Sequence, residues 1–219
     1  MYRALAYKEL RETWWLGAIA FIILAAHVCS AVGLNFDFER FKIRWEIVRT
    51  AIPFATGELD ELLLYTASSL GAALACWQTL GESFRGTWRF LRQRPMSLNA
   101  ILLTKIGTGL ALLLGVTAIP VLFYALWAAT PGTHASPFQW SMTVPTWRIW
   151  LVSSTAYLAA FLIGIRDVRW YGSRLWPAAP AVVWIWLISM LDLPVLVPTL
   201  AINGTIVGAI LFAAADRDE

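Results

Sequence analysis

The sequence predicts an all-α polytopic membrane protein with a single transmembrane domain over residues 1–219. Of the 219 residues, 59% are hydrophobic, only 14% are charged and 13 are Trp, which is typical of a membrane protein. Apolar runs recur along the chain, each near the length that crosses about 30 Å of hydrocarbon. Lys and Arg gather outside these runs, in the N-terminal segment and in some of the connections. The chain therefore uses lipid as its main solvent.

A scan with a window of about 19 residues predicts about six transmembrane helices. Asp192 lies between the last two runs, and Pro194 and Pro198 lie at the start of the last one, so residues 177–215 form either two full spans or a pair that includes a re-entrant element. The predicted spans are 16–34, 62–80, 101–127, 147–165, 177–191 and 194–215.

The N-terminal segment 1–14 is predicted to be an interfacial helix. It lacks the basic, apolar and small-residue regions of a cleaved signal, and we expect it to be retained. Its apolar side chains Leu5, Leu10 and Trp14 alternate with charged ones, which favours a helix lying in the membrane interface before the first span. A frayed, charged terminus is the alternative.

The distribution of Lys and Arg predicts that both chain ends are cytoplasmic, N-in and C-in. The N-terminal segment and the connections after the second and fourth spans are basic, whereas the connection after the third span has no Lys or Arg before Arg148. The connection after the first span conflicts with this orientation. Its basic residues are Arg40, Lys42, Arg44 and Arg49.

The first connection, residues 35–61, has two possible structures. Phe41, Ile43 and Trp45 alternate with charged residues, as in a half-buried strand. Phe38, Phe41 and Trp45 also fit one face of a helix, and periodicity does not decide between the two. In both cases the segment has an apolar side and a charged side, and we expect it to lie on the outer membrane surface or over the outer end of the bundle.

Small residues mark possible helix contacts between two copies of this chain. They recur at four-residue spacing in the third and sixth predicted spans, a pattern that lets helix backbones approach closely. The candidate dimer-packing residues are Gly107, Ala111, Gly115, Gly204 and Gly208.

Catalytic and metal-binding motifs are missing from the sequence. His27 and Cys29 share one predicted span, but two ligands do not make a metal site, and there is no metalloprotease or serine-hydrolase motif. Cys29 and Cys76 both fall within predicted spans and imply no disulfide. We therefore expect no enzyme activity, no catalytic residue and no metal on this chain.

The segment "ESFRGTWRFLRQRPMS", residues 82–97, lies between the second and third spans. Gly81 and Gly86 have the spacing of a phosphate-binding loop, but Thr87 and Trp88 follow where Lys and Ser or Thr are required. A helix here would place aromatic and aliphatic residues on one side and arginines on the other, and Pro95 would end it. The segment is therefore predicted to be a cytoplasmic amphipathic helix that contacts lipid headgroups or a soluble partner.

The first 115 residues or so resemble the permease subunit of ABC-2 type ABC transporters. The resemblance rests on the interfacial segment, on "ESFRGTWRFL" and on "RPMSLNAILLTK" before a long third span. The matching family positions are Glu82, Gly86, Thr87, Phe90, Leu91, Pro95, Ser97, Ile101 and Lys105.

The resemblance implies a multi-pass permease of the cell (inner) membrane, working as an exporter by alternating access. The implied partners are a second permease, identical or different, and a separate cytoplasmic ATPase subunit that holds the ATP and Mg²⁺, so this chain needs no cofactor. It implies no nucleic-acid partner. The segment after the second span would be the coupling helix that docks on the ATPase. The expected ATPase-docking residues are Glu82, Phe84, Arg85, Gly86, Thr87, Trp88, Arg89, Leu91, Arg92, Arg94 and Pro95.

A second hypothesis comes from a different functional class. The chain would be a membrane-embedded assembly or scaffold protein whose basic segment binds lipid or a partner without transport. If the chain is a transporter, the few polar groups in the spans favour a hydrophobic or amphipathic substrate over a small ion, because an ion needs buried charge partners.

Overall fold

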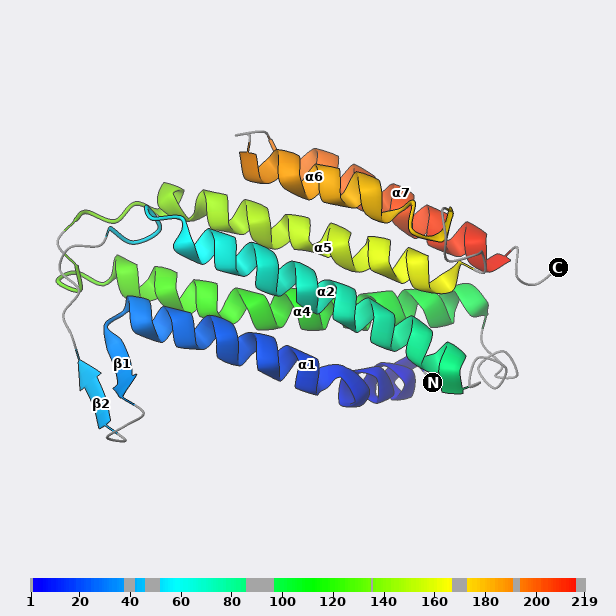
Figure 1. Ribbon diagram of the computed structural model, residues 1–219, viewed down its shortest axis with the longest axis horizontal. Helices are drawn as coiled ribbons and strands as arrows, with labels where there is room; N and C mark the ends of the chain where they lie inside the picture. The colour runs from blue at the N-terminus through cyan, green and yellow to red at the C-terminus, as the bar shows by residue number, and fades with distance from the viewer. Residues whose placement is uncertain are drawn as a thin grey trace.

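The computed structural model describes residues 2–37, 42–45, 52–85, 97–134, 136–166, 173–190 and 194–215. Within these ranges the chain forms an elongated bundle of six α-helices and a short antiparallel hairpin (Figure 1). The α-helices are α1 (Tyr2–Ala31), α2 (Glu58–Arg85), α4 (Leu98–Ala129), α5 (Val144–Ile165), α6 (Ala178–Met190) and α7 (Leu196–Ala215). The strands are β1 (Leu34–Asp37) and β2 (Lys42–Trp45), and the 3-10 helix η1 (Trp140–Thr143) precedes α5.

The bundle has two distinct ends, which we name by what lies there. The start of α1 and the ends of α2, α5 and α7 lie together at the terminal end, on the right of Figure 1. The β hairpin and the starts of α2 and α5 lie at the opposite, hairpin end. Because successive long helices run in opposite directions, residues far apart in sequence meet at each end.

Each of the six predicted spans falls on an α-helix. Four helical segments are long and apolar enough to cross a membrane: Tyr2–Ala31, Leu98–Ala129, Trp140–Ile165 and Leu196–Ala215. The prediction of a multi-pass, helical membrane protein is therefore confirmed at this coarser level. The first span was predicted to reach Leu34, but α1 ends at Ala31 and Leu34 begins β1.

The other two predicted spans differ from these four in length or polarity. Helix α2 has 28 residues, enough to cross a bilayer, but it carries acidic residues in its first turn and Gln78 and Thr79 near its end. Helix α6 has only 13 residues, which at 1.5 Å per residue extend about 20 Å, short of the hydrocarbon thickness. In Figure 1, α6 and α7 reach less far toward the hairpin end than α5 does.

The first connection contains strands in the part that the structure describes. β1 pairs antiparallel with β2, with Leu34 opposite Trp45 and Asp37 opposite Lys42. The strand alternative is thus confirmed over Lys42–Trp45. Gly33 has φ 91°, a conformation that a residue without Cβ adopts easily, and it lets the chain turn from α1 into β1.

The core of the bundle lies between α2 and α5. Small residues on α2, among them Ala67 and Gly71, let the two helices approach so closely that a Cβ on Gly71 would lie 3.2 Å from the Tyr157 backbone nitrogen. Tyr157 and Phe161 on α5 are fully buried there. α1 and α4 pack together on one side of this pair, and α6 and α7 pack on the other side of α5.

The predicted interfacial segment 1–14 and the first span are parts of one helix, α1, which runs without a break from Tyr2. The side that packs on the protein carries Leu5, Glu9 and Thr13, whereas Leu10 and Trp14 are exposed. The first half of α1 therefore contacts the bundle through a side that includes a carboxylate. Its placement in the membrane interface stays a prediction.

Candidate functional site

The predicted docking segment begins as a continuation of α2 at the terminal end. Glu82, Phe84 and Arg85 belong to the last turn of that helix, and the Phe84 side chain is 84% exposed. The remaining predicted docking residues lie outside the described residues: Gly86, Thr87, Trp88, Arg89, Leu91, Arg92, Arg94 and Pro95. The docking segment thus begins in the last turn of α2, at the terminal end of the bundle.

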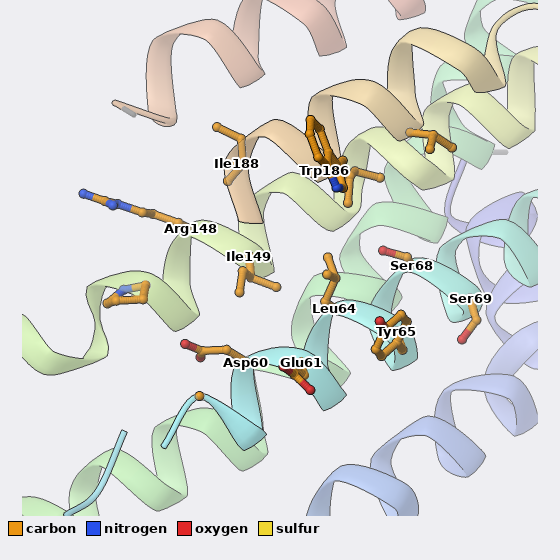
Figure 2. Close-up of a pocket in the computed structure, with 14 residues that line it drawn as sticks. Asp60, Glu61, Leu64, Tyr65, Ser68, Ser69, Arg148, Ile149, Trp186 and Ile188 are labelled. Carbon is orange, nitrogen blue, oxygen red and sulfur yellow. The ribbon is translucent and has the colours of Figure 1, made fainter. Parts of the chain in front are cut away.

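A pocket of about 1000 Å³ lies between α2, α5 and α6 near the hairpin end (Figure 2). We call it the α2–α5–α6 pocket. α2 and α6 each pack on α5, and the pocket occupies the space between them. Its size is at the upper end of the range for small-molecule sites, about 300–1000 Å³. Sequence reasoning missed it, because no motif marks a space between three helices.

The charged side chains of this pocket lie together at one end. Asp60 and Glu61 from α2 and Arg148 from α5 lie at the end nearest the hairpin, where Arg148 extends outward (Figure 2). Ile149 lies beside them, and the lining farther along the helices is uncharged and includes Leu64, Ser68, Ile185 and Trp186. The pocket is therefore charged at the end nearest the hairpin and uncharged beyond it.

Two polar groups in the pocket differ in their hydrogen bonding. Thr146 Oγ1 donates a hydrogen bond of 2.5 Å to Asp60 Oδ1, which ties the start of α5 to the start of α2. Burial raises the pKa of the Asp60 carboxyl above its ordinary value of 3.8, and the hydrogen bond from Thr146 partly offsets this rise. Ser68 Oγ is buried and has no hydrogen-bond partner within the described part of the chain.

The raised pKa of Asp60 gives the stability of the protein a defined pH dependence. The folded protein holds the proton of the Asp60 carboxyl more tightly than the unfolded chain does. The stability that protonated Asp60 contributes is therefore complete below pH 3.8 and is lost as pH rises through the folded-state pKa. Asp60→Asn, which can still accept from Thr146, should unfold at a higher temperature than the wild type at pH 7. Thermal unfolding of the two proteins in detergent, at pH 7 and at pH 3.5, checks this prediction.

The two proteins should unfold at the same temperature at pH 3.5, where the wild-type carboxyl is protonated. Glu61→Gln, one residue away and exposed, is the matched control. An equal stabilisation by both substitutions at pH 7 would mean that general charge reduction, and not the burial of Asp60, is responsible.

A second polar group lies in the interior near the terminal end and joins four helices. We call it the polar cluster; it consists of Glu9, Gln78, Lys105 and Tyr157. Lys105 Nζ lies 2.8 Å from Glu9 Oε1, and both side chains are almost completely buried. Tyr157 Oη donates to Gln78 Oε1 at 2.7 Å, and Gln78 Nε2 lies 3.4 Å from the Lys105 carbonyl oxygen. The cluster connects α1, α2, α4 and α5.

The polar cluster explains which side of α1 faces the bundle. An ammonium group without a partner is costly in a low-dielectric interior, and a carboxylate at 2.8 Å offsets much of that cost. Because Lys105 lies on the buried side of α4, Glu9 must face inward. Periodicity did not predict this, since hydrophobicity alone favours burial of Leu10 and Trp14.

The five candidate dimer-packing residues are all exposed in the single chain: Gly107, Ala111, Gly115, Gly204 and Gly208. A Cβ added at any of the four glycines would meet nothing within 4 Å. The closely packed glycines of α4 and α5 are different ones. Gly109 faces the Tyr157 side chain and Gly164 faces Thr79. A dimer contact through the predicted residues stays a prediction.

The described residues contain no three His, Cys, Asp or Glu side chains close enough to hold a metal ion. His27 lines a smaller pocket of about 260 Å³ with Glu58 and Tyr124 at the hairpin end. Cys29 is partly buried and Cys76 is exposed. No chemistry for His27 follows from these neighbours.

No protein-family model, no curated protein and no solved structure matches the chain.

Proposed function

We propose that this chain is the permease subunit of an ATP-driven ABC transporter of the ABC-2 type. It acts as an exporter by alternating access, and ATP is hydrolysed on a separate cytoplasmic ATPase subunit. The observation that carries the proposal is the course of α2. One helix of 28 residues, about 42 Å long, lines the α2–α5–α6 pocket at its start and leads into the docking segment at its end.

The distribution of basic residues along the bundle supports a cytoplasmic location for both chain ends. Arg3, Lys8 and Arg11 on α1 and Arg85 on α2 all belong to the terminal end, as the positive-inside rule requires of the cytoplasmic side. The pocket then opens near the outer surface of the cell membrane. In this topology α2 is a full span, and the short α6 forms a hairpin with α7 in place of a span of full length.

The packing of α2 suggests how movement would pass through the chain. Because α2 and α5 approach closely at Gly71, a displacement of α2 by the ATPase would carry α5 with it. The polar cluster would hold α1 and α4 to the same unit at the terminal end. The walls of the pocket would then move relative to α6, which contacts α5.

Co-purification tests the partner. The full-length tagged chain should bring down an ATPase subunit with a phosphate-binding loop, and both Trp88→Glu and Gly86→Trp should abolish its recovery. Trp88→Glu places a charge on the apolar side of the predicted coupling helix, and Gly86→Trp places a large ring at the position of close approach. Trp140→Glu, an exposed Trp in η1 on the opposite side of the membrane, is the matched control and should leave recovery unchanged.

Recovery of no ATPase from the wild type would overturn the proposal. If the chain instead recovers other membrane proteins and supports no export, the scaffold hypothesis is favoured. If Trp88→Glu and Trp140→Glu reduce ATPase recovery equally, the docking segment is not the contact.

A further inference from the structure

We propose that the α2–α5–α6 pocket binds one zwitterionic phospholipid of the phosphatidylethanolamine class. This names the substrate class of the proposed permease and so rests on the proposed function, although binding itself needs no ATPase. Two features carry it: charged residues of both signs at one end of the pocket, and an uncharged, largely apolar lining beyond them.

The charged residues lie at the depth of lipid headgroups. Asp60 and Glu61 directly precede the predicted span 62–80, and Arg148 lies in the first turns of α5, beside the predicted start of its span. Lipid headgroups occupy this level of a membrane. A ligand whose polar part contacts these residues and whose apolar part enters the pocket must lie parallel to the helices, as a lipid does.

The two signs of charge select the headgroup. The carboxylates of Asp60 and Glu61 attract an ammonium group with N–H donors, and the Arg148 guanidinium attracts a phosphate. Phosphoethanolamine carries both groups. A choline headgroup has no N–H to donate, and a glycerol headgroup leaves the carboxylates without a cation.

The uncharged lining of the pocket suits an acyl chain. Leu64, Ile149 and Ile185 offer aliphatic surface, and Trp186 adds its ring. Ser68 is eight residues after Asp60, about 12 Å deeper along α2. Figure 2 places Ser68 on the side of α2 that faces α5 and α6, so a larger side chain at this position would fill the pocket.

Native mass spectrometry of the purified full-length chain tests the inference. Dioctanoyl lipids with ethanolamine, choline or glycerol headgroups are added separately, and the fraction of protein with one bound lipid is measured. The ethanolamine lipid should bind at least about tenfold more tightly than the other two, the scale of one charge-assisted hydrogen bond. The double variant Asp60→Asn, Glu61→Gln should lose this preference.

Two further variants separate the pocket from the general lipid-facing surface. Ser68→Phe on α2 and Ile185→Trp on α6 fill the pocket from different sides, and each should reduce binding of the ethanolamine lipid at least about tenfold if its thermal unfolding matches the wild type. Glu58→Gln, also in the first turn of α2 but not lining this pocket, is the control and should bind normally.

Several outcomes would overturn the inference. They are equal binding of the three headgroups, preference for the glycerol headgroup, and unchanged binding in both pocket-filling variants. None of these outcomes depends on an ATPase. If lipid binds as expected but no ATPase co-purifies, the lipid site stands and the permease proposal fails; the reverse result removes only the lipid site.

Discussion

Replacing Lys105 by alanine is expected to destabilise the folded protein by about 3–5 kcal/mol, the usual cost of breaking a buried ion pair. The substitution leaves the Glu9 carboxylate, whose side chain is 3% exposed, without the cation that now lies 2.8 Å away. It also removes a long side chain from a site with no access to solvent. Unfolding in mixed micelles, followed by Trp fluorescence, measures the loss.

A charge-free pair separates the cost of leaving the buried Glu9 carboxylate without Lys105 from the cost of the lost side chain. The double variant Glu9→Gln, Lys105→Met keeps most of the volume and removes both charges, and it should recover most of the lost stability, because a buried ion pair and its apolar replacement are often close in free energy.

Lys8→Ala is the matched control for the loss of a lysine. Lys8 is about one-third exposed and lies 3.9 Å from the Glu9 and Glu12 carboxylates, so its loss should cost less than about 1 kcal/mol. If Lys105→Ala and Lys8→Ala have equal effects, the ion pair does not hold α1 to the bundle as we infer.

Replacing Gly109 by alanine is expected to have the second large effect, a loss of about 1–3 kcal/mol, as for an overpacked core. The added Cβ would overlap the Tyr157 hydroxyl and would lie 2.7 Å from Tyr157 Cε2. Tyr157 is fully buried and cannot move without breaking its hydrogen bond to Gln78 Oε1. The single methyl group therefore disturbs the polar cluster as well as the packing.

Gly107→Ala and Gly115→Ala are the matched controls for Gly109→Ala. All three glycines lie in α4, and a Cβ at Gly107 or Gly115 meets nothing within 4 Å. In the monomeric protein, each control should be neutral or should stabilise the chain by up to about 1 kcal/mol, because alanine favours the helical backbone over glycine. The same unfolding assay compares the three, and equal effects would show that Tyr157 is not held in the described position.

The long helices could be predicted because their main determinant is local. A run of about 20 apolar residues must be helical in lipid, where each backbone N–H and C=O group needs a partner within the segment. The span 101–127 thus falls within α4, and 147–165 within α5. The predicted end of the first span at Leu34 was wrong, because average hydropathy does not distinguish an apolar residue in a strand from one in a helix.

The candidate site could be predicted only in part. The sequence marked the docking segment, whose composition differs from its surroundings, but it did not mark the α2–α5–α6 pocket, whose walls come from three separated segments. It singled out Lys105 through a resemblance, without its partner Glu9, which precedes it by 96 residues. It selected Gly107 and Gly115 for contacts between two copies, which stays a prediction, but it did not mark Gly109, the glycine of α4 that meets a side chain of the same chain.

By itself, the sequence determined the solvent of this protein and the helices that cross it, because apolar length and backbone hydrogen bonding are properties of each segment alone. Only the tertiary structure decided which side of each helix is buried. That choice depends on partners from other helices: Glu9 faces inward because Lys105 is there, and Gly109 must be a glycine because Tyr157 lies against it. In a chain this apolar, hydrophobicity is similar all round most of the helices, α2 being the exception, so these few polar and close contacts orient them.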